Sequence, residues 1–577
     1  MTSTDWLVIA VTLCSIVLYG LYKSSTTKNL DGYFLSNRTM PWYLVLLSIM
    51  GTQASAITFL SAPGQAYTDG MRFVQYYFGL PLAMVVICIT FVPIFRKLKV
   101  YTAYEFLEHR FDNKTRTLTS FLFFLQRGLS TGISIYAPSI ILALLFGWDI
   151  FWTNIGMGGV LIIYTVAGGA KAVAYTQQLQ LIIILIAMFL AGYMVIKMLP
   201  ENVGFSDALH IGGKLGKLNV ITAGADEHGF NWNDRYNIWS GIIGGFFLAL
   251  SYFGADQSQV GRYLTAQNNR ESRLGLLING LVKVPMQFFI LLIGVLLLAF
   301  YQFNPAPLSF NTSLVDDAKN SIYKESIQLI QTKYDSVAQL KNKKVTAFVE
   351  AIKNKKQDSI DLVAGELKTL NSASDAYRDQ FKNLSKRISD KDTNDTNFIF
   401  LAFVKEHLPA GLKGLLIAII FLAAWGSIAA ALNSLAASTV VDFHQRIVGK
   451  DKPINEYRIS KWYTLGWGIF CILIAQFAYQ LGNSLIEAVN VLGSLFYGVI
   501  LGIFLVAFYV KRVKGAATFW SAVIVETFVV ILFFNEQIKF SNGFAPFGFL
   551  PDVSFLWLIP IGALGVVVLG WVLQKLH

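Results

Sequence analysis

Long apolar runs alternate with short polar stretches along most of this chain. An α-helix rises about 1.5 Å per residue, so about 20 apolar residues cross the hydrocarbon core of a bilayer. On this criterion the pattern predicts about 13 spanning helices. Their centres lie near Leu13, Gln53, Val85, Gly132, Gly158, Ala187, Leu250, Leu291, Trp425, Ile469, Gly498, Val525 and Leu564. The predicted fold class is an all-α protein that crosses a membrane many times.

Two of the predicted spans are interrupted by residues that weaken helices. The second contains Gly51-Thr52-Gln53-Ala54-Ser55, and the seventh contains Gly254-Ala255-Asp256-Gln257-Ser258-Gln259. Irregular backbone at membrane depth is tolerated where it lines a cavity or is buried in protein. Two broken helices in corresponding halves indicate the binding site of a secondary transporter, and a separation of five spans fits an inverted five-plus-five repeat. The alternative is that the small residues only allow helices to pack closely.

A hydrophilic segment separates the eighth and ninth predicted spans. Residues 304–397 hold 15 Lys or Arg and 13 Asp or Glu, which is 28 of the 82 charged residues in the chain. Tyr323, Ile327, Ile330, Tyr334 and Val337 recur at helical spacing. The segment is predicted to be a helical extracytoplasmic insertion between two parts of a membrane bundle, 1–303 and 398–577. A structural extension is the favoured interpretation, and a ligand-binding role is the alternative.

Basic residues predict how the chain is oriented. They gather in alternate loops, at 96–116, 262–273, 444–461 and 511–514. Cytoplasmic loops carry an excess of Lys and Arg, so this pattern predicts an N-terminus outside and a C-terminus in the cytoplasm. Asp5 rather than a basic residue precedes the first apolar run, so a cleaved signal peptide is not predicted. The predicted location is the plasma (inner) membrane.

Composition excludes several classes of protein. Of the 577 residues, 54% are apolar and 14% are charged, whereas soluble domains are about 25% charged. The net charge of +12 resides mainly in short loops that orient helices, so nucleic acid is not a predicted partner and the lipid bilayer is. The three cysteines lie in apolar runs without metal-ligand spacing, and no cluster of catalytic groups indicates an enzyme.

Four charged side chains fall inside predicted spans, where a charge costs roughly 2.5–3.5 kcal/mol on insertion scales. They are Asp256, Lys283, Glu487 and Glu526. Asp256 and Lys283 have opposite signs and occupy consecutive spans, so a mutual ion pair and a shared polar substrate both remain open. Glu487 and Arg127 are expected near span ends, where long side chains reach the interface.

Several short motifs, in this order and spacing, resemble the sodium/solute symporter family of sugar, sialic acid, iodide, monocarboxylate and vitamin transporters. The motifs are Gly32-Tyr33-Phe34-Leu35, Ser55-Ala56-Ile57-Thr58, Thr102-Ala103-Tyr104-Glu105-Phe106-Leu107, Ala167-Gly168-Gly169-Ala170-Lys171-Ala172-Val173, Gly254-Ala255-Asp256-Gln257 with Arg262-Tyr263-Leu264, and Ala431-Leu432-Asn433-Ser434. The resemblance covers nearly the whole chain apart from the insertion. It implies the inverted-repeat bundle of the leucine-transporter type.

The resemblance also implies a sodium site and a substrate site. The family's shared Na⁺ ligands map to Gly51 and Ala54 in the first broken helix, and to Ala423, Gly426 and Ser427 in a later span. Gly426 replaces a hydroxyl residue of many relatives. Gln177 stands where relatives with an additional sodium site carry Asp, so an additional site is not expected.

The candidate substrate residues resemble those of two different branches of the family. Thr58, Asp256 and Lys283 match polar contacts of sugar carriers, and Gln53 lies beside them in the first break. Tyr136 resembles the iodide and monocarboxylate branch instead, so the solute and the oligomeric state stay open.

The predicted function is sodium-coupled symport, the import of a small polar organic solute by alternating access. The alternatives are proton coupling through Asp256 on the same fold and, in a different class, a solute sensor or receptor.

Overall fold

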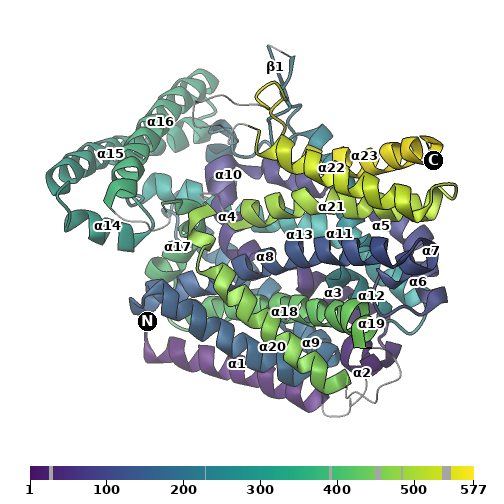
Figure 1. Ribbon diagram of the computed structural model, residues 1–577. Coiled ribbons are helices and arrows are strands. Elements are labelled where there is room, and N and C mark those ends of the chain that lie inside the picture. Colours follow the sequence, from purple (N-terminus) through teal and green to yellow (C-terminus); the bar gives the residue numbers. More distant parts are fainter. Residues whose placement is uncertain are drawn as a thin grey trace.

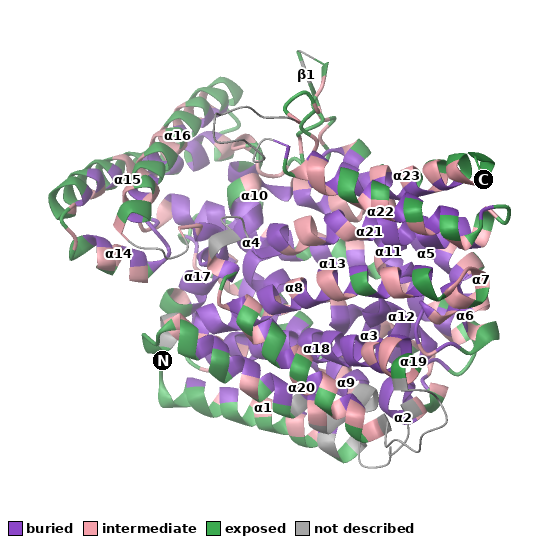
Figure 2. Ribbon diagram, viewed as in Figure 1, coloured by how far each residue is buried: buried purple, intermediate pink, exposed green. Residues whose placement is uncertain are grey.

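The computed structural model describes residues 1–24, 30–227, 229–388, 393–448, 456–481, 485–535 and 547–576. The described chain is a bundle of long helices, with one small antiparallel hairpin in these ranges (Figure 1). Buried residues concentrate along the middle of the bundle, and exposed residues concentrate on its periphery (Figure 2).

Helices form nearly all of the regular structure, and η denotes their 3-10 and π segments. Before the insertion the elements are, in chain order, α1 (Ser3–Ser24), α2 (Leu30–Leu35), η1 (Ser36–Arg38), α3 (Trp42–Gln53), α4 (Ala56–Asp69), η2 (Met71–Tyr77), α5 (Leu80–Val86), η3 (Ile87–Phe91), α6 (Val92–Leu98), α7 (Glu105–Arg110), α8 (Asn113–Phe146), α9 (Ile150–Lys197), α10 (Phe205–Lys214), β1 (Ala225–Asp226), β2 (Gly229–Phe230), η4 (Ser240–Gly244), α11 (Gly245–Gly254), α12 (Gln257–Leu264) and α13 (Asn269–Phe303). Within and after the insertion they are α14 (Thr312–Lys319), α15 (Lys324–Lys353), α16 (Gln357–Ile388), η5 (Asp395–Asn397), α17 (Ile399–His407), α18 (Leu412–Ser438), η6 (Thr439–His444), α19 (Gln445–Val448), α20 (Glu456–Ala475), η7 (Ala478–Leu481), α21 (Leu485–Tyr509), α22 (Gly515–Phe533) and α23 (Phe555–Leu576).

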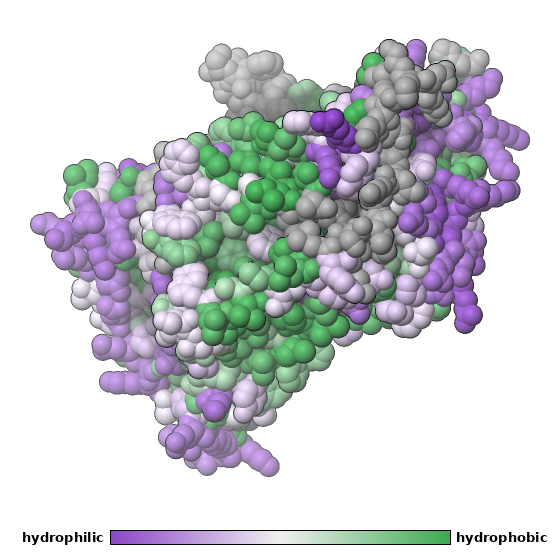
Figure 3. Space-filling view, turned by 90° about the horizontal axis from the view of Figure 1, so that it is seen from below, coloured by the Kyte–Doolittle hydropathy of each residue, from purple (hydrophilic) through white to green (hydrophobic). Residues whose placement is uncertain are grey.

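Helix length and apolarity are those of a multi-pass membrane protein. Among the described residues, eight helices are long and apolar enough to cross a bilayer, or nine if α3 and α4 count as one bent span. Figure 3 shows a broad hydrophobic zone with hydrophilic side chains at its two ends, as a surface surrounded by lipid requires. The helical segment α9 covers two of the predicted spans, so the expected number of 13 stays a prediction.

Both predicted helix breaks are present. α3 ends at Gln53 and α4 begins at Ala56, with a bend of 60° between them. α11 ends at Gly254 and α12 begins at Gln257, and Asp256 caps the second half by accepting a hydrogen bond from the Ser258 amide at 2.7 Å. The breaks therefore free backbone groups in the middle of the bundle.

The hydrophilic segment contains a helical hairpin, α15 and α16, which projects beside the bundle (Figure 1). Its own small apolar core includes Leu314, Tyr334 and Phe381. Arg378 donates hydrogen bonds to the Pro307 carbonyl at 2.8 Å and to the Tyr334 hydroxyl at 3.1 Å. These contacts anchor the hairpin at its base. The domain limits 304 and 397 stay a prediction.

The residues after the hairpin touch the broken helix α4 directly. A Cβ at Gly64 would lie 1.8 Å from the carbonyl oxygen of Thr396 in η5. We expect Gly64→Ala to destabilise the protein by about 1–3 kcal/mol, because backbone must move to admit the methyl group. The thermal melting midpoint measures this effect. Gly365→Ala on α16 is the matched control: nothing lies within 4 Å of that Cβ, so this change should not lower the midpoint.

Candidate functional site

A cavity of about 160 Å³ lies beside the break between α3 and α4 and next to the end of α11. Polar and aromatic side chains from several helical segments line it: Thr52, Gln53, Ser55, Thr58, Tyr76, Tyr77, Gln126, Arg127, Ser130, Thr131, Ser134, Tyr252, Lys283, Ser427, Asn490 and Tyr497. A few hydrogen-bonding groups on an otherwise apolar wall are typical of a small-molecule site. The cavity is therefore the candidate solute site.

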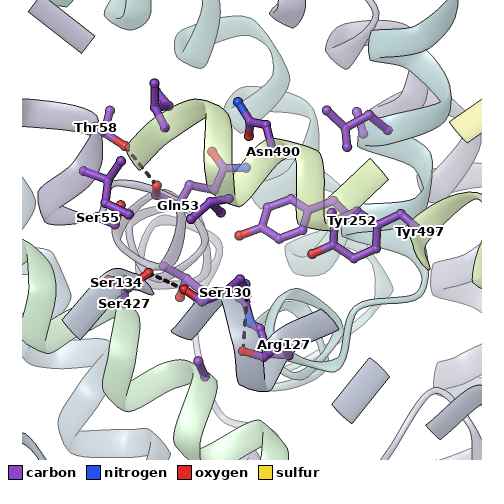
Figure 4. Close-up of a pocket in the computed structure, with 18 of the residues that line it drawn as sticks. Gln53, Ser55, Thr58, Arg127, Ser130, Ser134, Tyr252, Ser427, Asn490 and Tyr497 are labelled. Carbon is purple, nitrogen blue, oxygen red and sulfur yellow. Dashed lines mark hydrogen bonds between the residues drawn. The ribbon is translucent and has the colours of Figure 1, made fainter. Parts of the chain in front are cut away.

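One wall of the cavity is a row of hydroxyl groups on α8. Ser130 and Ser134 are one helical turn apart, and the Ser134 hydroxyl donates to the Ser130 carbonyl at 2.9 Å (Figure 4). Tyr252 and Tyr497 place two phenol groups on another side of the cavity. Asn490 on α21 accepts a hydrogen bond from the Tyr76 hydroxyl at 2.9 Å. The wall thus offers donors and acceptors to a polar solute.

Both charged side chains in the described lining of the cavity are cations. Lys283 on α13 is 2% exposed and Arg127 on α8 is 9% exposed. Within the described chain Lys283 forms no ion pair, and its ammonium lies 5.5 Å from the ring centre of Tyr77. No carboxylate is among the described lining residues. An isolated buried cation is costly, so this cavity favours an anionic ligand.

Asp256 is placed differently from the sequence-based hypothesis. It does not line the cavity with Lys283, and within the described chain the two residues form no ion pair. Its Oδ2 accepts a hydrogen bond from the Tyr497 hydroxyl at 2.7 Å and lies 3.8 Å from Arg127 Nη1. Asp256 caps α12, and its carboxylate lies toward Arg127 on α8 rather than toward Lys283 on α13.

Arg127 is the charged partner of Asp256, and the sequence alone did not predict this pair. It was expected to reach the cytoplasmic interface, but it is buried beside Asp256 and hydrogen bonds to the Ser258 hydroxyl. Its side chain also lies 5.7 Å from the ring centre of Tyr252. The sequence held one signal that Arg127 faces the cavity. Its spacing of four and then three residues to Thr131 and Ser134 places all three residues on one face of the helix.

The other predicted substrate residues divide into two groups. Gln53 and Thr58 line the cavity, and the Thr58 hydroxyl reaches the Gln53 carbonyl at 3.4 Å. Tyr136, also on α8, is buried outside the lining residues, because its position faces away from the row formed by Ser130 and Ser134.

The predicted sodium ligands lie on the two expected elements. The Ser55 amide bonds to the Gln53 carbonyl at 3.0 Å instead of reaching back to Gly51, so the Gly51 carbonyl loses its helical partner. Ala54 sits in the break itself. Ser427 on α18 lines the cavity, and its hydroxyl donates to the Ala423 carbonyl at 3.0 Å. Freed carbonyls and a hydroxyl oxygen fit a hard cation such as Na⁺.

Gln177 and Gln180 pack against Gly426. Gln177 also links α9 to both predicted sodium-binding elements. Its carboxamide donates to the Gly426 carbonyl at 3.0 Å and to the Thr52 hydroxyl at 3.1 Å, and it accepts from the Ser48 hydroxyl at 2.8 Å. A Cβ at Gly426 would lie 2.6 Å from Gln180 Oε1 and 3.2 Å from Gln177 Cγ. The Gln180 side chain therefore occupies the space that a side chain at residue 426 would need, and the Gln177 carboxamide already engages one predicted ligand carbonyl.

The chain is similar to one protein family and to several known proteins. A family model described as the sodium:solute symporter family matches residues 33–322 and 376–524. The sodium/sialic acid symporter SiaT of Proteus mirabilis (strain HI4320) is 25% identical, over 98% of this chain and 93% of that protein. The human sodium-coupled monocarboxylate transporter 1 is 31% identical, over 48% of this chain and 44% of that protein.

A solved structure has a similar fold. It is described as the substrate-bound outward-open state of a Na⁺-coupled sialic acid symporter, and it aligns with a TM-score of 0.74 and 23% identity. The alignment covers 100% of this chain and 98% of that one. The fold is thus shared over the whole length of this chain.

Proposed function

Because the chain belongs to the sodium:solute symporter family, and is a multi-pass membrane protein that couples solute transport to Na⁺, we propose that its solute is a small polar organic anion with a carboxylate group. The observation that carries this proposal is the pair of cations, Lys283 and Arg127, in a cavity whose described lining holds no carboxylate. Arg127 is already paired with Asp256, which leaves the Lys283 ammonium for the solute.

Two further features support an anion. The hydroxyl row of α8 can bind the uncharged polar groups of the solute while Lys283 binds its carboxylate. Three of the similar proteins are named for sialic acid, monocarboxylate and iodide, which are anionic solutes, and another is named for vitamins. Proton coupling through Asp256 is not favoured, because Arg127 and the Tyr497 hydroxyl already engage that carboxylate outside the cavity lining.

Sodium is proposed to bind at the break between α3 and α4. The Gly51 and Ala54 carbonyls and the Ser427 hydroxyl are its candidate ligands, and the engaged carbonyls of Ala423 and Gly426 are weaker candidates. Bound Na⁺ would supply a positive charge at the break. We also propose that the protein transports its solute by alternating access in the plasma (inner) membrane. The insertion would then lie outside the cell.

The experiment measures uptake into proteoliposomes under a Na⁺ gradient with three probes: N-acetylneuraminate, lactate and D-glucose. We expect Na⁺-dependent uptake of a carboxylate probe and none of D-glucose. Lys283→Met should lower uptake roughly tenfold or more, since a hydrogen bond to a charged group contributes about 1.5–3 kcal/mol. Lys344→Gln, which removes an ion-paired cation from the insertion, is the matched control and should leave uptake unchanged. Uptake of D-glucose that is insensitive to Lys283→Met would contradict the proposal.

A further inference from the structure

Arg262 is a buried cation whose charge no group of the described chain neutralises. It is 3% exposed and belongs to α12, every residue of which is buried. Within the described chain its guanidinium forms no ion pair, and its Nε and Nη1 atoms have no hydrogen-bond partner. A buried charge is costly unless an anion or hydrogen bonds compensate it, so Arg262 calls for an anionic partner.

Arg116 shows how the same bundle holds an arginine that the fold itself pairs. It is 2% exposed on α8, and its guanidinium lies 2.5 Å from Glu108 Oε2 and 2.5 Å from Asp442 Oδ1. Two carboxylates of the chain therefore neutralise Arg116. The contrast indicates that Arg262 is not simply a structural cation.

The turn of α12 that carries Arg262 is linked to the central cavity. Arg127 lines the cavity and donates a hydrogen bond to the Ser258 hydroxyl, and Arg262 follows Ser258 by four residues on the same face of α12. Tyr252 also lines the cavity, and its hydroxyl accepts a hydrogen bond at 2.8 Å from Gln259, three residues before Arg262. Arg262 therefore lies about one helical turn beyond two residues that contact the cavity lining.

The far end of α12 leads away from the insertion. Figure 1 shows α12 in the half of the bundle remote from the insertion. Just after α12, the Thr265 carbonyl accepts a hydrogen bond from the Met40 amide at 3.0 Å, and the Ala266 carbonyl accepts one from Arg96 Nη1 at 2.8 Å. This end is cytoplasmic in the proposed orientation. Arg262 thus lies between the cavity and the cytoplasm.

We propose that Arg262 binds the carboxylate of the solute on its way from the central cavity to the cytoplasm. The solute class rests on the proposed function, whereas the place of the contact rests on Arg262 and α12. The Nε and Nη1 donors of Arg262 take the carboxylate. Gln259 Oε1 and the Tyr263 hydroxyl, which have no hydrogen-bond partner in the described chain, take hydroxyl or amide groups of the solute.

This contact passes the carboxylate from one cation to another. When the bundle opens toward the cytoplasm, the solute leaves Lys283 and meets Arg262, so its charge is compensated during exit. The contact forms late, and it is absent while the cavity faces outward. Arg262 therefore acts on the cytoplasmic side of the transport cycle alone.

The melting midpoint of the purified full-length protein tests whether Arg262 is paired within the fold. Arg262→Gln removes a buried charge that has no partner, so the midpoint should stay the same or rise. Arg116→Gln leaves Glu108 and Asp442 without their cation and should lower the midpoint. A fall for Arg262→Gln as large as that for Arg116→Gln would overturn the proposal, because it would show that the fold itself pairs Arg262.

Transport in both directions tests the contact with the solute. Radiolabelled N-acetylneuraminate and lactate are measured in right-side-out and inside-out membrane vesicles, with Na⁺ equal on both sides. Arg262→Gln should raise KM at the cytoplasmic face by about three- to tenfold and leave KM at the outer face within twofold. Without a gradient the ratio of maximal rate to KM is equal in both directions, so the maximal efflux rate should rise in proportion. Arg262→Lys keeps the charge and should restore most of the cytoplasmic affinity.

Arg96→Gln is the matched control at the same end of the bundle. Arg96 donates to the carbonyls of Ala266 and Gln267, so its loss should change neither KM. For Arg262→Gln, equal rises at both faces would place Arg262 in the central site, and unchanged values at both faces would remove it from the solute path. Either result overturns the exit contact and leaves the proposed function intact. Failure of the wild type to transport either carboxylate contradicts the proposed function itself.

Discussion

Replacement of Asp256 by asparagine is expected to destabilise the protein by about 3–5 kcal/mol, the cost of breaking a buried ion pair from one side. Arg127 would stay buried without its carboxylate, and Asp256 itself is only 1% exposed. The asparagine has one carbonyl oxygen, so it can accept only one of the two hydrogen bonds that Asp256 accepts from the Ser258 amide and the Tyr497 hydroxyl. The loss of stability therefore includes one hydrogen bond as well as the charge. The change in melting midpoint in detergent measures it.

The double variant Asp256→Asn/Arg127→Gln should recover most of this stability, because it leaves no unpaired charge. Asp256→Asn/Lys283→Met should not recover it, because Lys283 is not the partner. Asp361→Asn, which breaks the exposed pair with Lys214, is the control and should change the midpoint little. Recovery by Lys283→Met instead of Arg127→Gln would show that the ion pair is assigned to the wrong residue.

Sodium alone, without solute, is expected to raise the melting midpoint of the purified protein. A ligand that binds only the folded state at 100 times its Kd adds about 2.7 kcal/mol to the free energy of unfolding. Ser427→Ala should remove most of this gain, because it deletes the candidate hydroxyl ligand at the break. The measurement is a melting series in Na⁺ at constant ionic strength, with K⁺ as the replacement ion.

Ser434 offers a matched control on the same helix. It is 5% exposed, and its hydroxyl donates to the Ala430 carbonyl at 2.8 Å, the same local bond that Ser427 makes to Ala423. Ser434→Ala should therefore lose the local bond but keep the response to Na⁺. Equal midpoints in Na⁺ and K⁺ for the wild type would refute the sodium site at the α3–α4 break.

The positions of the helix breaks could be predicted from the sequence, because small and polar residues in an apolar run leave few alternatives at membrane depth. The directions of side chains could not. Asp256 and Lys283 are both buried in the bundle, and the cap of α12 directs Asp256 toward Arg127. Such a choice depends on the rotation of three helices about their axes, which hydropathy does not report.

Gly426 shows a similar limit. The sequence reveals that a hydroxyl is missing there, but only the packing shows that the Gln177 and Gln180 side chains fill the space. The ion pair between Arg235 and Glu487 also escaped prediction, because its two residues lie in segments far apart in the sequence.

The 60° bend between α3 and α4 also has an electrostatic consequence. Aligned peptide dipoles give a helix about half a negative charge at its C-terminus and half a positive charge at its N-terminus. The end of α3 therefore attracts a cation, while the start of α4 attracts an anion a few residues away. The start of α12 already holds an internal carboxylate, Asp256, whereas Ser55 at the start of α4 makes no side-chain cap bond. Under the proposed function, this helix end would add to the attraction that Lys283 exerts on an anionic solute in the same cavity. The opposite charges of the two ligands at these adjacent helix ends would then attract each other. Each ligand would raise the affinity for the other by the same factor, and the bend would couple the ion to the solute.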